Sequence, residues 1–81
     1  MKRDFALRID TFLWSARESL AHIADHMRNH VSCGDLSDEE FKHYVEFIGK
    51  SMGETVKMSN RLYEEFPDIR PDELKSDWKR N

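Results

Sequence analysis

The sequence predicts an all-α protein: an antiparallel helical hairpin of two long helices, followed by a short C-terminal helix. The first observation behind this prediction is a periodicity, because apolar side chains recur at alternating spacings of three and four residues along two stretches of about 28 residues each. The second is a short connection that carries both a helix-ending and a helix-starting signal. The 81 residues are therefore expected to form one helical domain, residues 1–81.

The first helix is expected at about residues 4–32, a stretch without proline or glycine. It should end at Cys33 and Gly34, because glycine adopts the left-handed conformation that closes a helix C-terminus. The apolar face of this helix consists of Ala6, Ile9, Leu13, Ala16, Leu20, Ile23 and Met27.

The second helix is expected at about residues 38–66, and its start carries a clear signal. Ser37 is the expected N-cap, and Glu40 completes a capping box in which each side chain bonds the other residue's backbone N–H. Leu36 and Phe41 form the matching hydrophobic staple. The inner face of this helix consists of Phe41, Val45, Ile48, Met52, Thr55, Ser59, Leu62 and Phe66.

Two prolines mark the end of the second helix and the start of a third. Pro67 should end the long helix, because the residue before a proline is disfavoured in helical conformation. Pro71 suits the first position of a short helix at about residues 71–79. Leu74 and Trp78, four residues apart, would lie on one side of that helix.

The connection of about five residues makes the long helices antiparallel neighbours, yet apolar side chains extend beyond the seam between them. Each large apolar side chain left exposed forgoes about 1.5–3 kcal/mol of burial, and a core in so short a chain rarely contributes more than about 3–5 kcal/mol. Pairing two hairpins into a four-helix bundle would recover that burial, so a homodimer is expected. The residues expected to contact a second copy or another protein are Phe5, Phe12, Tyr44, Gly49, Val56, Tyr63 and Trp78.

Gly49 and Gly53 interrupt the second helix, and each costs about 1 kcal/mol relative to alanine. One interpretation is a notch at Gly49 into which another helix, or a ring such as that of Trp14, packs closely. The other interpretation is that the helix simply tolerates both glycines.

A metal site is the sharpest chemical candidate in the sequence. His22, His26 and His30 are spaced four residues apart on the first helix, and imidazoles at that spacing can share a divalent transition metal such as Zn²⁺. The simpler interpretation, which the sequence favours, places these histidines at the polar margin of the helix. A contact between His30 and His43 across the connection is a further interpretation, and it would give a pH-sensitive packing point.

Composition argues against several classes of protein. The longest apolar runs are far shorter than the roughly 20 residues that span a bilayer, so no membrane segment is expected. The charges are mixed in sign and sum to −3, which argues against nucleic-acid binding. Cys33 is the only cysteine, which excludes an internal disulfide and, with no signal peptide, favours a cytoplasmic location.

The stretch from Ser37 to Leu74 contains the segments SDEEF, GKSMGE and LYEEFPDIRPDEL. With an acidic helix cap, a glycine-bearing long helix and a Tyr-Glu-Glu-x-Pro helix end in this order, it resembles a group of small helical bacterial proteins without an assigned function. The resemblance implies a bacterial cytosolic protein and no particular activity.

Together these observations predict a non-enzymatic, homodimeric helical module that binds another protein. No catalytic residue is expected, because the serines lack a nucleophile elbow and the thiol lacks an activating neighbour. No cofactor is expected either. The alternative function is a metal-binding bundle that uses the histidines of the first helix.

Overall fold

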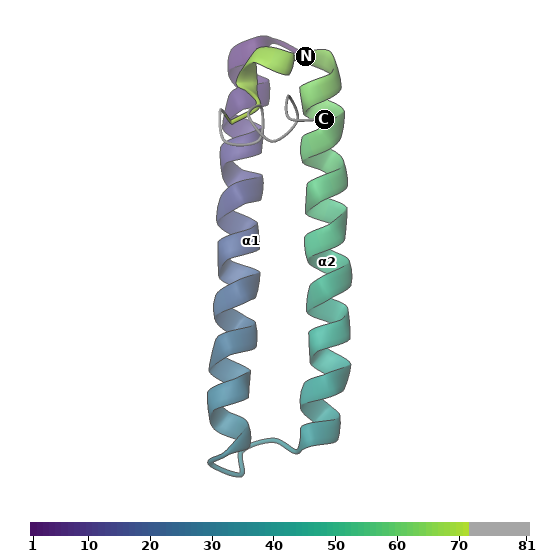
Figure 1. Cartoon of the computed structure of the whole chain (residues 1–81). Helices are drawn as coiled ribbons and strands as arrows, with labels where there is room; N and C mark the ends of the chain where they lie inside the picture. Colours follow the sequence, from purple (N-terminus) through teal and green to yellow (C-terminus); the bar gives the residue numbers. More distant parts are fainter. Residues whose placement is uncertain (72–81) are drawn as a thin grey trace.

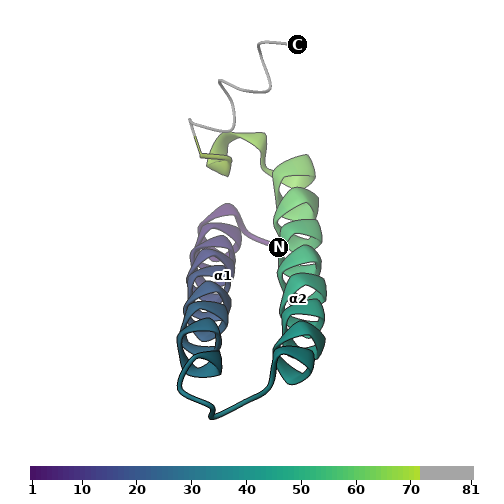
Figure 2. The same ribbon diagram turned by 60° about the horizontal axis from the view of Figure 1, so that its bottom comes forward.

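The computed structural model describes residues 1–71, and these form an α-helical hairpin (Figure 1). Helix α1 spans Arg3–Val31, helix α2 spans Asp38–Glu65, and a 3₁₀ turn, η1, spans Pro67–Ile69. The two helices run side by side in opposite directions for their whole length, as Figures 1 and 2 both show. The all-α hairpin expected from the apolar periodicity is therefore confirmed, while the third helix expected at residues 71–79 lies almost wholly outside the described residues.

The end of α1 forms the turn expected at its glycine. Gly34 has φ of 82°, the left-handed conformation that L side chains rarely adopt, and it is the only described residue with positive φ. The backbone N–H groups of Gly34 and Asp35 donate to the carbonyls of Val31 and His30, at 3.1 Å each. These bonds satisfy the carbonyl groups that the last turn of a helix leaves without a partner.

The start of α2 is a complete capping box. The backbone N–H of Glu40 donates to Ser37 Oγ at 3.1 Å, and the backbone N–H of Ser37 donates to Glu40 Oε1 at 3.0 Å. The helix start predicted from the sequence is confirmed, since both halves of this reciprocal pair are local and depend on no other part of the chain.

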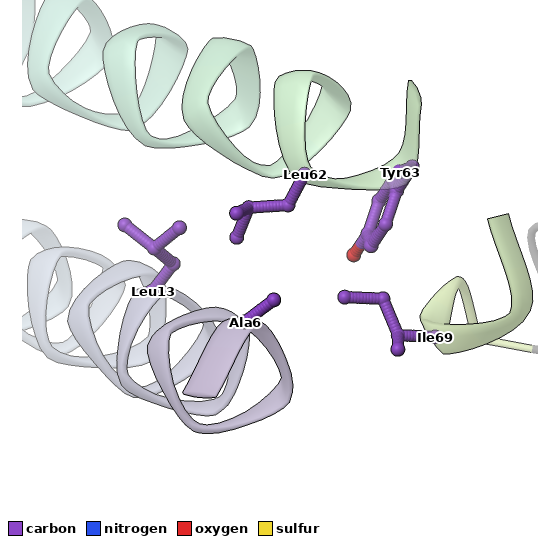
Figure 3. Packing of buried hydrophobic residues seen from close by; sticks show 5 residues of the cluster. All are labelled: Ala6, Leu13, Leu62, Tyr63 and Ile69. Carbon is purple, nitrogen blue, oxygen red and sulfur yellow. The ribbon is translucent and has the colours of Figure 1, made fainter. Parts of the chain in front are cut away.

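The hydrophobic core lies at one end of the hairpin, opposite the connection. Its five buried apolar side chains point toward one another from α1, α2 and η1, as Figure 3 shows, and they are Ala6, Leu13, Leu62, Tyr63 and Ile69. Between Trp14 and Met58 no residue is fully buried, so the half of the hairpin nearer the connection has only a partly exposed seam. A core this small leaves much apolar surface in contact with water.

The turn η1 closes the core end of the hairpin. Pro67 cannot continue the helical hydrogen bonding of α2, and the chain instead folds over toward the start of α1 (Figure 1). This places Ile69 in the core, and the side chains of Arg3 and Asp68 form an ion pair across the same end. The helix end was expected from the sequence, whereas the return of the chain onto α1 was not.

Candidate functional site

A buried carboxylate lies between the two helices, directly beside the core. The Asp10 residue of α1 is only 3% exposed. Its Oδ1 accepts a hydrogen bond from Ser59 Oγ at 2.8 Å, and its Oδ2 accepts one from Tyr63 Oη at 2.9 Å. Both donors come from α2, so Asp10 joins the helices through hydrogen bonds to a charged group, which are stronger than those between neutral groups.

The guanidinium group of Arg17, two turns along α1 from Asp10, continues this polar cluster. Arg17 donates from Nη1 to both Thr55 Oγ1 and Ser59 Oγ, and from Nη2 to Ser59 Oγ, at 3.2 Å in each case. The Ser59 hydroxyl therefore accepts from Arg17 and donates to Asp10. Ser59 Oγ therefore bridges the Arg17 guanidinium and the Asp10 carboxylate.

Aromatic rings form the outer wall of the cluster. The indole Nε1–H of Trp14 donates to Tyr63 Oη at 3.3 Å, and the guanidinium of Arg17 lies over the Trp14 ring at 4.4 Å from its centroid. This separation is within the range of a cation–π contact. The guanidinium of Arg70, which follows η1, lies 5.9 Å from the centroid of the Tyr63 ring.

A cavity of about 230 Å³ opens on this wall. Its lining combines two rings, two guanidinium groups, two small polar groups and one aliphatic side chain, and it consists of Trp14, Arg17, Val56, Ser59, Asn60, Tyr63 and Arg70. Among residues 1–71, no carboxylate lines it. We define these seven residues as the aromatic-arginine pocket.

Burial raises the pKa of the Tyr63 phenol above its ordinary value of 10.0. The indole N–H of Trp14 opposes this rise, because it stabilises the phenolate, and the Asp10 carboxylate adds to it by hydrogen bonding and by charge. Tyr63 is therefore held as a neutral donor to Asp10 at neutral pH.

The residues predicted to contact a second copy lie in three different places. Phe5, Phe12, Tyr44 and Val56 are all exposed, with Phe12 at 67%. Tyr63 instead belongs to the core: its ring packs with Leu62 and Ile69, and its hydroxyl donates to Asp10. It is buried within one copy of the chain, whereas it was expected at the surface from the sequence. Trp78 lies outside the described residues.

The proposed notch at Gly49 is open. A Cβ atom added at Gly49 would have nothing within 4 Å, and the same holds for Gly53. The ring of Trp14 therefore does not pack against Gly49, since it is engaged with Arg17 and Tyr63. Within a single copy of residues 1–71, therefore, no other segment packs closely against Gly49 or Gly53.

The histidines of α1 lie along its exposed margin. The rings of His26 and His30 are 4.4 Å apart, and His30 Nδ1 bonds the Asp35 carboxylate rather than His43. His22 and His26 both line a shallow hollow on α1, together with Ile23 and Met27. Within residues 1–71, no three His, Cys, Asp or Glu side chains are gathered in a way that could hold a metal ion.

Sequence reasoning missed Asp10, Arg17 and Arg70 as members of a site. A signal for the first two is present, since Ala6, Asp10, Leu13 and Arg17 follow one another at spacings of four, three and four on the inner side of α1. The partners on α2, Thr55 and Ser59, were assigned to the inner face but not recognised as hydrogen-bonding residues. Nothing in the local sequence indicates that Arg70 returns to this site.

Comparisons of the chain with protein-family models, with curated proteins and with solved structures found no match. None of the described helices combines the length and the apolar character needed to cross a membrane.

Proposed function

We propose that this chain is a non-enzymatic helical module that pairs with a second copy of itself into a four-helix bundle and acts by binding another protein. The observation that carries the proposal is an exposed apolar face on one side of the hairpin. It includes Phe12, Phe47 and Met58, which are 67%, 62% and 54% exposed. Side chains of this size are seldom left in water when a stable alternative exists.

The apolar face is built from both helices. Ile9 of α1 and Met58 and Leu62 of α2 line one surface hollow, which places these flanks of the two helices on the same side of the hairpin. Phe5 and Phe12 lie four residues before and three residues after Ile9, spacings that keep them on its side of α1. The pocket described above lies on the other side, since it is lined by Trp14 and Val56.

The apolar face contains two clusters of exposed side chains, Phe12 with Met58 and Ile23 with Phe47. Ile23 follows Phe12 by eleven residues and Met58 follows Phe47 by eleven residues, which is about three helical turns or roughly 16 Å. The bonds from Arg17 to Thr55 and Ser59 set the register of the antiparallel helices. In that register Phe12 lies within about one helical turn of the level of Met58, and Ile23 lies within about one turn of the level of Phe47.

This arrangement suits a two-fold axis. An axis that lies in the plane of the apolar face, perpendicular to the helices and halfway between the clusters, would place the Phe12–Met58 cluster of one copy on the Ile23–Phe47 cluster of the other. Each copy would then use the same surface, with α1 on α1 and α2 on α2. The ring of Tyr44, which contacts that of Phe47 at 6.3 Å between centroids, would join the second cluster. Tyr44 and Phe12, two of the contacts expected from the sequence, therefore belong to the proposed interface.

The area of the hairpin face formed by the two helices also suits a specific dimer. Helix α1 has 29 residues. At about 1.5 Å per residue and about 10 Å of width per helix, two such helices offer a face of roughly 800 Å². That is about the area that each partner contributes to a standard specific interface.

The test is the mass of the protein in solution. Sedimentation equilibrium at micromolar concentration should give twice the chain mass of 9.7 kDa for the wild type. Phe12→Glu and Phe47→Glu should each shift the protein to a monomer that is still helical. The control is Leu7→Glu, an exposed apolar residue of α1 on the opposite flank, which should leave the dimer intact. A helical wild-type monomer at these concentrations would contradict the proposal.

A charge-pair experiment tests the geometry of the dimer. Under this axis Phe12 of one copy lies opposite Ile23 of the other. The double variant Phe12→Glu with Ile23→Lys should therefore dimerise more tightly than either single variant, because opposite charges then face each other across the interface. A double variant that is as monomeric as the single ones would exclude this axis.

Binding to another protein is tested separately on the surface that the dimer leaves exposed. A photo-crosslinking residue at Val56, which lies on the pocket side, should give one defined adduct in the native cell. The same residue at Phe12 should instead give adducts between two copies of this chain. A Val56 probe that crosslinks only to a second copy would contradict the protein-binding part of the proposal.

A further inference from the structure

We infer that the aromatic-arginine pocket binds a carboxylate group attached to a small apolar or aromatic body. Its carboxylate would take hydrogen bonds from Arg17 and Arg70, and its apolar body would pack between Val56 and the rings of Trp14 and Tyr63. This site lies on the side of the hairpin away from the proposed dimer face, so the inference does not depend on the dimer.

The first argument is the number of donors left over. An arginine side chain has five N–H donors in a planar fork. Arg17 uses three hydrogen bonds to Thr55 and Ser59, which leaves Nε–H and one N–H of Nη2 without an acceptor among the described residues. The Nε atom of Arg70 is buried and has no hydrogen-bond partner within residues 1–71. A buried donor without an acceptor is costly, so a small turn of the Arg70 side chain that brought this N–H to an anion in the cavity would be favourable.

The second argument is charge. Of the residues that the structure describes, two guanidinium groups and no carboxylate line the cavity, in a chain whose formal net charge is −3. The nearest acid of the hydrogen-bonded cluster, Asp10, lies behind Ser59 and Tyr63 and already accepts a hydrogen bond from each. It offsets part of the charge of Arg17 through Ser59, but it occupies none of the donors that remain. The cavity therefore offers positive charge with free donors, which selects an anion.

The third argument favours a carboxylate with an apolar body over an inorganic anion. The lining of the cavity also includes the apolar side chain of Val56 and the rings of Trp14 and Tyr63. Water or a bare phosphate ion gains nothing from these apolar groups, whereas a phenyl or aliphatic group does. The volume of about 230 Å³ lies below the roughly 300–1,000 Å³ of sites for drug-sized ligands, so the ligand is small.

The arginines are held in place for this task. Arg17 is held by its hydrogen bonds to Thr55 and Ser59 and lies 4.4 Å from the centroid of the Trp14 ring. Arg70 lies 5.9 Å from the centroid of the Tyr63 ring, so both guanidinium groups are at the pocket before a ligand arrives. Trp14 and Tyr63 are joined by their own hydrogen bond. A preformed site of this kind avoids the entropic cost of ordering long side chains on binding.

The experiment is an NMR titration of the ¹⁵N-labelled full-length chain with phenylacetate. Saturable shifts are expected at the indole N–H of Trp14 and at the Nε–H of Arg17. Phenylacetamide, which has the same shape without the charge, should give no saturable shift at the same concentrations, and inorganic phosphate should bind at least about tenfold more weakly than phenylacetate because it cannot use the apolar wall. A response that is equal for the amide, or confined to phosphate, would overturn the inference, as would the absence of saturation with every probe.

Variants locate the site. Arg17→Gln and Arg70→Gln should each weaken phenylacetate binding by about tenfold or more, the effect expected for loss of a hydrogen bond to a charged group. Arg61→Gln is the control, because Arg61 is an exposed arginine of α2 that lines the hollow on the other side of the hairpin, and this variant should leave binding unchanged. Arg17 also supports the helix pairing, so Arg70→Gln is the decisive variant if Arg17→Gln does not fold. Unchanged affinity in Arg70→Gln would overturn the inference.

A second pair of ligands distinguishes the source of the carboxylate. A short peptide that ends in phenylalanine should bind with a free carboxyl terminus and not with an amidated one. If the free peptide binds more tightly than phenylacetate, the natural ligand is a chain terminus. If it binds equally or more weakly, the ligand is a free small acid. Both results support the carboxylate site, whereas equal binding of the amidated peptide would contradict it.

Discussion

The phenol of Tyr63 on α2 donates a hydrogen bond of 2.9 Å to the carboxylate of Asp10 on α1, a residue only 3% exposed. The bond joins two helices that have few fully buried apolar contacts elsewhere, and it holds one wall of the aromatic-arginine pocket. Because Asp10 also accepts from Ser59, this carboxylate and the bonds of Arg17 to Thr55 and Ser59 together set the register of the helices near the core end.

The Asp10→Asn variant should destabilise the hairpin. In the wild type, two hydroxyl groups donate to the Asp10 carboxylate. An asparagine side chain keeps an acceptor oxygen for one of these hydroxyl groups and turns its amide N–H groups toward the other. Hydrogen bonds to a charged group are worth about 1.5–3 kcal/mol, and a loss of that order is expected in the free energy of unfolding, measured by urea denaturation. Asp25→Asn is the control, because its pair with Arg28 is exposed, and it should change stability by no more than about 0.5 kcal/mol. An Asp10→Asn protein as stable as wild type would show that the buried charge contributes nothing.

The raised pKa of Tyr63 predicts a loss of stability in alkali. A group whose pKa is higher in the folded chain than in the unfolded chain contributes stability that is complete below the unfolded value, here about 10. That contribution is lost as the pH rises through the folded value. The melting temperature of wild type should therefore fall above pH 10, while Tyr63→Phe, less stable at pH 7, should show a shallower fall. The exposed Tyr44 provides the control, Tyr44→Phe, which should keep the wild-type slope; identical slopes in all three proteins would contradict the prediction.

The Ile69→Ala variant should be among the most damaging single changes outside the helices. Ile69 is buried, and its side chain packs on the core from η1. Truncation of a buried isoleucine to alanine typically costs about 2–5 kcal/mol, a large part of the stability of so small a domain. The midpoint of urea unfolding measures this loss, and Leu7→Ala, at an exposed site of α1, should shift that midpoint little. A small effect of Ile69→Ala would mean that η1 does not close the core in solution.

The Ser37→Ala variant should lower stability by about 1 kcal/mol, because the backbone N–H of Glu40 loses its acceptor at the start of α2. Ser51→Ala, at an exposed position within the same helix, is the matched control and should have no effect or stabilise slightly, since alanine is the better helix former. Thermal unfolding followed by circular dichroism resolves the difference. Equal melting temperatures for the two variants would exclude a contribution from the cap.

The Gly49→Ala and Gly53→Ala variants should each stabilise the protein, by about 1 kcal/mol, since an added Cβ meets open space at both positions and removes the cost of glycine within a helix. Urea unfolding at several protein concentrations measures this gain. If Gly49→Ala weakens self-association while Gly53→Ala does not, the notch expected from the sequence exists between two copies, and the dimer uses the pocket side instead of the apolar face.

The local features of this protein were predictable from its sequence because each depends on residues close together in the chain. The alternating apolar spacing specifies a helix face, Gly34 permits the left-handed turn, and Ser37 with Glu40 closes a reciprocal pair across three residues. The exposure of Phe12 and Tyr44 also followed from the sequence, since a hairpin can bury only one seam and these residues lie on its flank. The pairing of two copies stays a prediction.

Only the tertiary structure decided where the polar site lies. Asp10 and Ser59 are separated by 49 residues along the chain, and Asp10 and Tyr63 by 53, so no local pattern connects them. A carboxylate within an apolar stripe suggests a solvated margin until the antiparallel register brings two hydroxyl donors to its level. Arg70 reaches the pocket only because η1 folds back over the core end. The sequence determined the helices and their caps by short-range geometry, whereas the register and the return of the chain determined the site, because these set which distant side chains meet.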